Sequence, residues 1–248
     1  SAINNKNLSF VFSSTLKSKI SSNFITNCSF YSGYRNPNID DIGKVFSKND
    51  KTVIIPNPEL KPEKSNNIEA GLVYSFRKKL HFNIQFFNSY IINAIKRSNS
   101  SLNGDTMLLY DGLMTRIQMN KNIASANIYG VNFMWIYNLN KKWLFKSACN
   151  YVKGIDNEKI PLSHIPPLNL KLDAKYNFKN QYVLLNLKYT AWKYENEYDL
   201  AGVDNLEEAT VDGNPSWHTI NLYYNNKLTR SIDVIIGLEN IMDVHYKH

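Results

Sequence analysis

Hydrophobic and polar residues alternate with a period of two along much of the chain. In the clearest run, residues 168–178, every even position is apolar and every odd position is polar. The same alternation recurs at residues 68–76, 129–139 and 232–238. Because successive side chains of a strand point to opposite faces, each run predicts a strand with one apolar and one polar face.

The pattern predicts ten strands of unusual length. They cover residues 8–16, 20–34, 65–77, 80–97, 125–139, 142–153, 167–178, 181–193, 216–228 and 231–243. Strands of soluble domains usually have about five or six residues, whereas a tilted strand that crosses a bilayer needs roughly 9–11. Strand length therefore favours a transmembrane barrel over a soluble sandwich.

The connections between these strands alternate between short and long. Short turns fall near residues 17–20, 77–80, 139–142, 178–181 and 227–231, and long loops at 35–64, 98–124, 154–166 and 194–215. Bacterial outer-membrane barrels have short periplasmic turns and long external loops. We therefore predict an all-β protein, part of an antiparallel transmembrane β-barrel. Aromatic residues near strand ends, such as Tyr74, Trp143 and Trp192, fit the interfacial girdles of such a barrel or ordinary strand packing.

Composition narrows the possible functions. No run of about 18 apolar residues occurs, so a helical membrane span is excluded. The net charge of +8 fits a solvated surface, an anionic ligand or an anionic membrane surface, but Lys and Arg are too scattered for a nucleic-acid site. Cys28 and Cys149 form neither a disulfide framework nor a zinc site. The sequence motifs of common enzyme classes are absent, so we expect no enzymatic activity and no cofactor.

Three segments carry recognisable motifs. The first begins Tyr34-Arg35-Asn36-Pro37 where a predicted strand ends. The second is an Asn-Pro box that opens the next strand, made of Asn57, Pro58, Glu59, Leu60, Lys61, Pro62 and Glu63. The third, near the end of the chain, is Glu239-Asn240-Ile241-Met242-Asp243. The prolines mark turns, and we expect Arg35 and lysines to pair with Glu63, Glu69 and Glu239 on the polar faces.

These segments, in this order, resemble the TonB-dependent outer-membrane transporters. Ile165-Pro166-Pro167 at a strand entry is also similar to that family. The resemblance implies a 22-stranded barrel plugged by an N-terminal domain, with residues 1–248 forming about strands 12 to 21. The plug, its TonB box and the last strand are not found in these residues. The resemblance implies a location in the bacterial outer membrane, with its lipid and lipopolysaccharide, the TonB complex and a surface lipoprotein as possible partners.

The external loops supply the candidate ligand contacts. Cationic and aromatic side chains there suit an anionic metal chelate, and we expect contacts from Arg35, Lys44, Tyr110, Arg116, Lys121 and Tyr198. Haem is disfavoured, because haem receptors of this family place a His between the first two motifs and residues 38–56 have none. The acidic loop 194–215 suggests either calcium or a solvated surface, and no metal site is predicted.

Three functions remain open. The first is TonB-dependent uptake of a scarce large nutrient, such as a ferric siderophore, cobalamin or another metal chelate. The second is a barrel that does not transport, acting as an adhesin or as part of a larger membrane assembly. The third is a soluble all-β domain. A plug and TonB box in the full-length protein would favour the first over the second.

Overall fold

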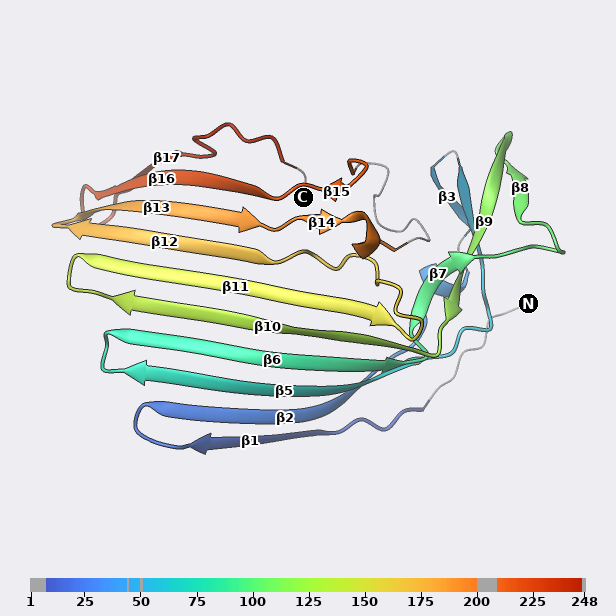
Figure 1. The fold of residues 1–248 in the computed structure, drawn as a ribbon, viewed down its shortest axis with the longest axis horizontal. Coiled ribbons are helices and arrows are strands. Elements are labelled where there is room, and N and C mark those ends of the chain that lie inside the picture. The colour runs from blue at the N-terminus through green and yellow to red at the C-terminus, as the bar shows by residue number, and fades with distance from the viewer. Residues whose placement is uncertain (1–7, 44, 50, 200–208, 247–248) are drawn as a thin grey trace.

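The main feature of the computed structural model is one antiparallel sheet of ten strands, called here the wall. The model describes residues 8–43, 45–49, 51–199 and 209–246. In order across the wall the strands are β1 (Ser13–Lys19), β2 (Phe24–Arg35), β5 (Glu63–Phe76), β6 (Leu80–Ile92), β10 (Ser125–Asn138), β11 (Trp143–Asp156), β12 (Asn169–Phe178), β13 (Gln181–Thr190), β16 (Trp217–Lys227) and β17 (Asp233–Leu238). Figure 1 shows the short turns at one end of the wall, the turn end, and the long connections at the other, the loop end.

The register of the wall keeps the two faces chemically separate. Leu172 of β12 lies opposite Ser147 and Leu187, and the next residue, Asp173, lies opposite Lys146 and Asn186 on the other face. Side chains alternate in this way across every neighbouring pair of strands. The wall therefore has an apolar face and a polar face, as predicted. Near the turn end, aromatic rings pack across strands on the apolar face, for example Trp143 on Tyr176 with 4.8 Å between centroids.

Two long connections contain a second sheet that the sequence pattern did not predict. The first connection forms α1 (Ile39–Ile42), β3 (Phe46–Asn49) and β4 (Thr52–Ile55). The second forms β7 (Ile95–Asn99), β8 (Met107–Tyr110) and β9 (Leu113–Asn122). These five strands form a mixed sheet in the order β3-β4-β9-β7, with β8 also paired to β9. We call it the loop sheet, and it lies beyond the loop end of the wall (Figure 1).

The loop sheet has a small apolar core of its own. Val53 and Ile55 of β4 pack with Ile117 of β9, and their exposed fractions are 0%, 7% and 0%. β4 and β9 run parallel, and both contribute to this core. The β8–β9 hairpin turns at Asp111 and Gly112, whose φ angles of 50° and 78° suit a two-residue turn.

Several predicted strand boundaries are wrong, and three of the differences have a clear local cause. The first hairpin turns at residues 20–23, not 17–20, because the Ser21 Oγ accepts the amides of Asn23 and Phe24 there, each at 3.2 Å. β6 ends at Ile92 instead of residue 97, since Asn93 adopts a φ of 55° and the chain then enters the loop sheet. β17 ends at Leu238 instead of residue 243, because a turn begins at Asn240.

The fourth long connection holds a two-stranded ribbon, β14 (Lys193–Tyr194) and β15 (Gly213–Asn214), with the short 3-10 helix η1 (Glu195–Glu197). Among the described residues, no helix is long and apolar enough to span a membrane.

Candidate ligand-binding region

The first motif forms a charged junction at the loop end of the wall. Arg35, the last residue of β2, forms ion pairs with Glu63 at the start of β5 and with Asp41 of α1, the latter at 2.7 Å. The other Glu63 oxygen accepts the amide of Ile95 at 2.6 Å. The Glu63 hydrogen bond is the main cause of a raised pKa of Arg35, so the guanidinium stays charged. The predicted pairing of Arg35 with Glu63 is present, and it links the wall to both parts of the loop sheet.

Asp41 also completes a capped turn within this junction. The Asn38 side chain accepts the Asp41 amide at 2.9 Å, and an Asp41 carboxylate oxygen accepts the Asn38 amide at 3.0 Å. This reciprocal pair is a capping box, which satisfies amides at the start of α1. The turn therefore holds Asp41 in place for Arg35.

The Asn-Pro box fastens the loop sheet to the wall. Asn57 donates to the carbonyl of Asn120 on β9 at 2.8 Å, and Leu60 is only 5% exposed. The Asn122 side chain bonds both the amide and the carbonyl of Lys61, at 2.8 and 2.9 Å. Pro58 and Pro62 have no amide to donate, so the asparagines supply the contacts that hold this segment. The box acts as a structural anchor.

The third motif, near the opposite edge of the wall, ends a row of hydrogen-bonded polar side chains, called here the polar chain. The Asn240 amide donates to the Asn221 side chain at 2.8 Å. Asn221 donates to Asn186 at 2.8 Å, and Asn186 donates to Asp173 at 2.6 Å. Asn240 also bonds Val244 in both directions, which closes the turn. The sequence shows asparagines on the polar faces of neighbouring strands, and these could have suggested this row of hydrogen bonds. Which side chains pair can be known only from the register of the strands.

A buried ionic cluster links three long connections and was missed in the sequence. The ammonium of Lys96 lies 3.0 Å from Asp156 and 3.4 Å from Asp199. The three side chains are 10%, 5% and 2% exposed. The Ser163 hydroxyl donates to Asp199 at 2.6 Å. Lys96, Asp156 and Asp199 are far apart in sequence and share no motif, so only the fold brings them together.

The predicted ligand contacts lie in different surroundings. Tyr110 packs against the core of the loop sheet, and Tyr198 is 3% exposed with the Lys193 ammonium 4.3 Å from its ring centroid. Arg116 is exposed on β9, and the Lys121 ammonium donates to the Asn99 carbonyl at 3.2 Å. Lys44 lies outside the described residues. Binding by these side chains remains a prediction.

Arg97 of β7 is a further cationic candidate that the sequence did not single out. Its guanidinium carbon lies 5.5 Å from the ring centroid of Phe46. Burial lowers the pKa of Arg97, and within the described part of the chain its Nε has no hydrogen-bond partner and its guanidinium no carboxylate partner. Because its Nε is buried and unpaired among the described residues, Arg97 is a candidate contact for an anion.

The acidic connection does not form a metal site within the described residues. No group of three or more His, Cys, Asp or Glu side chains is placed to hold a metal ion there. Glu197 accepts the amide of Tyr194 at 2.9 Å. Asp204, Glu207 and Glu208, which belong to the possible calcium loop, lie outside the described residues.

Three solved structures similar to this chain are each larger than it. The copper transporter OprC superposes with a TM-score of 0.74 at 16% identity, over 94% of this chain and 33% of OprC. The ferric enterobactin receptor PfeA from Pseudomonas aeruginosa, in complex with enterobactin, gives a TM-score of 0.76 at 17% identity, over 94% and 35%. The siderophore receptor PirA from Acinetobacter baumannii gives 0.72 at 17%, over 94% and 37%. The chain thus spans about a third of these structures.

A search of curated proteins found no match. The family model described as "TonB dependent receptor-like, beta-barrel" matches residues 13–241, which include all of the wall. Members of this family are β-barrel proteins of the bacterial outer membrane. The chain therefore belongs to the TonB-dependent receptors and forms part of their outer-membrane β-barrel.

Proposed function

We propose that the full-length protein takes up a scarce metal chelate, such as a ferric siderophore or cobalamin, across the outer membrane. The observation that carries the proposal is the loop sheet. It is an ordered platform with a dry core, and the junction at Arg35 and the Asn-Pro box attach it to the wall. An ordered platform at the external end of a barrel suits the capture of a specific ligand better than it suits passive diffusion through an open pore.

The charge of the loop sheet supports an anionic ligand. Arg97 lacks a carboxylate partner among the described residues, and Arg116 is exposed on the same sheet. We propose that these two, with Lys121 and Lys44, attract the chelate, and that Tyr110 and Tyr198 shape the surrounding surface. Arg35, which pairs with Asp41 and Glu63, holds the charged junction in place instead of binding the anion directly. PfeA and PirA are named as siderophore receptors and OprC as a copper transporter, which supports metal-linked uptake without selecting the metal.

The energy for uptake would come from the TonB complex. In this proposal a plug domain of the full-length protein carries the TonB box, and bound chelate at the loop end favours engagement of TonB from the periplasm. Loss of uptake after disruption of TonB is therefore expected.

Uptake by a deletion strain tests the proposal directly. The strain is grown with ferric siderophores of several classes, cobalamin or chelated copper as the sole source, and radiolabelled uptake is measured. We expect loss of growth on one source and recovery with the full-length gene. Growth equal to wild type on every source would overturn the proposal and favour a barrel that does not transport.

A matched pair of variants locates the binding surface. Arg97→Gln is expected to weaken chelate binding by roughly tenfold, the effect of removing one charged hydrogen-bond donor. Arg230→Gln, in a short turn at the opposite end of the wall, is expected to leave binding unchanged. Equal affinity of the two variants would remove Arg97 from the proposed site.

A further inference from the structure

Cationic side chains gather on the short turns at one end of the wall. The five turns join neighbouring strands in order across the wall, and they lie side by side at the turn end (Figure 1). With the residues that flank them, these turns carry nine Lys and Arg side chains, called here the basic rim. All of them are exposed: Lys19, Arg77, Lys78, Lys79, Lys141, Lys142, Lys179, Lys227 and Arg230.

The basic rim has almost no opposing charge. No Asp or Glu lies within the five turns, and the first carboxylate beyond them, Asp233 at the start of β17, accepts a hydrogen bond from Asn225 at 2.8 Å. No side chain of the rim forms an ion pair within the described parts of the chain. Since the net charge of the whole chain is +8, the rim accounts for essentially all of it.

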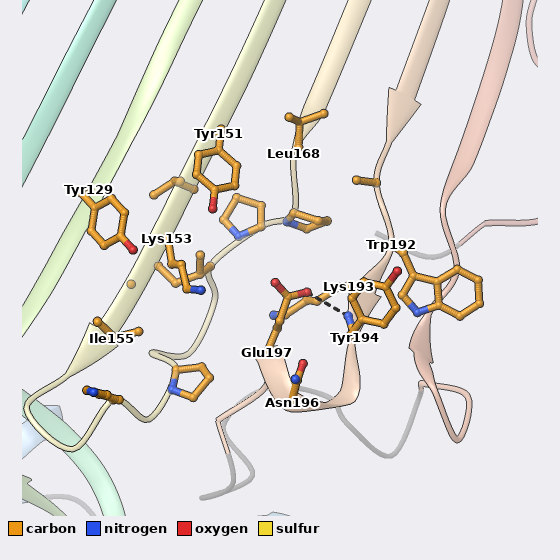
Figure 2. Close-up of a pocket in the computed structure, with 18 residues that line it drawn as sticks. Tyr129, Tyr151, Lys153, Ile155, Leu168, Trp192, Lys193, Tyr194, Asn196 and Glu197 are labelled. Carbon is orange, nitrogen blue, oxygen red and sulfur yellow. Dashed lines mark hydrogen bonds between the residues drawn. The ribbon is translucent and has the colours of Figure 1, made fainter.

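The loop end of the wall does not share this one-sided charge. Figure 2 shows a pocket of about 600 Å³ there, which Lys153 and Lys193 line together with Glu197. In the same region Lys96 pairs with Asp156. Cations at the loop end are thus accompanied by carboxylates, whereas those of the basic rim are not.

Hydrogen bonds from one turn to the next hold part of the rim in a fixed arrangement. The Asn138 side chain, at the end of β10, donates to the Lys78 carbonyl at 3.0 Å. The Asn177 side chain of β12 donates to the Lys142 carbonyl at 3.1 Å. Each bond fastens one turn to the strand that leads into the next turn. Three neighbouring turns therefore form one ordered row of cations.

Two cations of the rim occupy a backbone conformation that favours glycine. Arg77 and Lys179 have φ angles of 50° and 54°, in the left-handed region that few residues with a Cβ adopt. Lys179 is also the first residue of the two-residue turn between Phe178 and Gln181, where Gly or Asn is favoured when φ is positive. This conformation costs roughly 1–2 kcal/mol for each residue. Cations at such positions indicate a role for the charge that stability does not explain.

The basic rim is a long row that is only one turn wide. Neighbouring strands lie about 4.8 Å apart, so turns that join successive pairs of strands repeat roughly every 10 Å. Outer-membrane barrels have their short turns in the periplasm, and the row therefore faces the peptidoglycan layer. A linear polymer with carboxylates along its length matches such a row better than a globular protein does, because a stable protein interface needs about 800 Å² on each partner.

We propose that the basic rim binds peptidoglycan through the free carboxylates of its peptide stems. Cations on successive turns would contact carboxylates along one glycan strand. The rings of Phe76 and Tyr137 orient two of these cations, with the Arg77 guanidinium carbon 5.2 Å and the Lys79 ammonium 5.9 Å from the respective ring centroids. This contact would hold the barrel against the cell wall, and it does not depend on which substrate the barrel transports.

Co-sedimentation of the full-length protein with purified peptidoglycan sacculi, in mild detergent, tests the rim. One variant carries Lys78→Gln, Lys79→Gln, Lys141→Gln and Lys142→Gln. The control removes the same charge from four exposed lysines at the loop end, with Lys61→Gln, Lys64→Gln, Lys153→Gln and Lys159→Gln. We expect the rim variant to bind more than about tenfold more weakly, because each lysine near an anionic surface contributes up to roughly fivefold. The control should stay within about twofold of wild type, and circular dichroism checks that both variants retain the fold.

Two further arms identify the group that is bound. Sacculi whose carboxylates are converted to amides should bind the wild-type protein weakly, and high salt should weaken binding to untreated sacculi. Phosphatidylglycerol vesicles at equal charge should not displace the protein, because their headgroups form no linear array along the rim. Undiminished binding to amidated sacculi, or equal binding of the two quadruple variants, would overturn the proposal. Displacement by the vesicles would also overturn it, in favour of a site for lipid headgroups.

Discussion

The wall and the loop sheet both bury polar residues, but they differ in the hydrophobic residues that they bury. Among the buried hydrophobic residues that the structure describes, Ala126 is the one in the wall, whereas Val53, Ile54, Ile55 and Ile117 belong to the loop sheet. The wall instead buries polar side chains such as Asn67, Asn186 and Asn221. Its large apolar residues, including Leu185, are partly exposed on the apolar face.

This difference follows from the solvent of each region. The loop sheet lies in water and is stabilised by removing apolar area from it. The apolar face of the wall contacts lipid tails, which are as apolar as leucine, so no comparable driving force acts there. The wall is stabilised instead by strand pairing, because every backbone polar group in the membrane needs a hydrogen-bond partner. Rows of hydrogen-bonded side chains across its polar face contribute as well.

The largest effect is expected from the buried cluster that joins the loops. Lys96→Met removes the ammonium that pairs with the buried Asp156 and Asp199 and is expected to destabilise the loop end by roughly 3–5 kcal/mol. Hydrogen exchange should increase at residues 157–168 and in β7, while the wall keeps its protection. Lys64→Met, at an exposed position, is the control. Equal exchange in the two variants would show that the cluster does not join these connections.

Truncating one large apolar side chain in each region compares the stability cost in a water-excluded core with the cost on a lipid-facing surface. Ile117→Ala leaves a cavity in a dry core and is expected to cost about 3 kcal/mol. Leu185→Ala on the apolar face is expected to cost less than about 1 kcal/mol, because lipid tails fill the space. Thermal unfolding in vesicles and proteolysis of β8 and β9 measure both effects. A similar stability cost for both variants would contradict the claim that apolar burial stabilises the loop sheet more than the wall.

The polar chain across the wall provides a third test. Asn221→Leu leaves Asn186 and the Asn240 amide without their partner and is expected to cost about 2 kcal/mol, the penalty for an unsatisfied buried polar group. Apolar replacement at Ile117, such as Ile117→Leu, is the contrasting change, with an expected cost below about 1.5 kcal/mol. An increase in unfolding temperature for Asn221→Leu would contradict this description of the polar face.

The smallest effect is expected at the charged junction. The Arg35 side chain is 46% exposed, and an ion pair in contact with solvent contributes at most about 1 kcal/mol. Arg35→Gln should therefore lower stability only slightly, and raising the salt concentration should reduce the difference from wild type. Stability measured in low and high salt checks this. A loss that salt does not change would indicate that the junction is effectively buried.

The sequence predicted the wall well because one period governs it. Strands with a strict two-residue alternation, such as β12, were placed within one or two residues, and the resemblance of the three motifs named the family. The first hairpin was misplaced because Lys17 and Lys19 look like turn residues, although both lie on β1. A strand with polar residues on one face and small residues on the other carries a weak signal.

The loop sheet and the ionic cluster were not predictable in the same way. β4 is a run of four residues with three apolar side chains and no alternation, so its type is ambiguous from sequence. Its parallel partner, β9, comes from another connection. Arg97 has no motif, and its lack of a carboxylate partner among the described residues is visible only once the fold places its neighbours.

Accessibility along one strand tests the central claim, that the wall separates lipid from a polar interior. Single cysteines are placed at successive positions from Leu170 to Asn177 of β12, in full-length protein with Cys28 and Cys149 replaced by serine. In intact outer membranes, a water-soluble maleimide should label the odd positions, and a lipid-soluble quencher should reach a fluorophore at the even ones. Uniform labelling by maleimide at both sets of positions would contradict a lipid-facing wall.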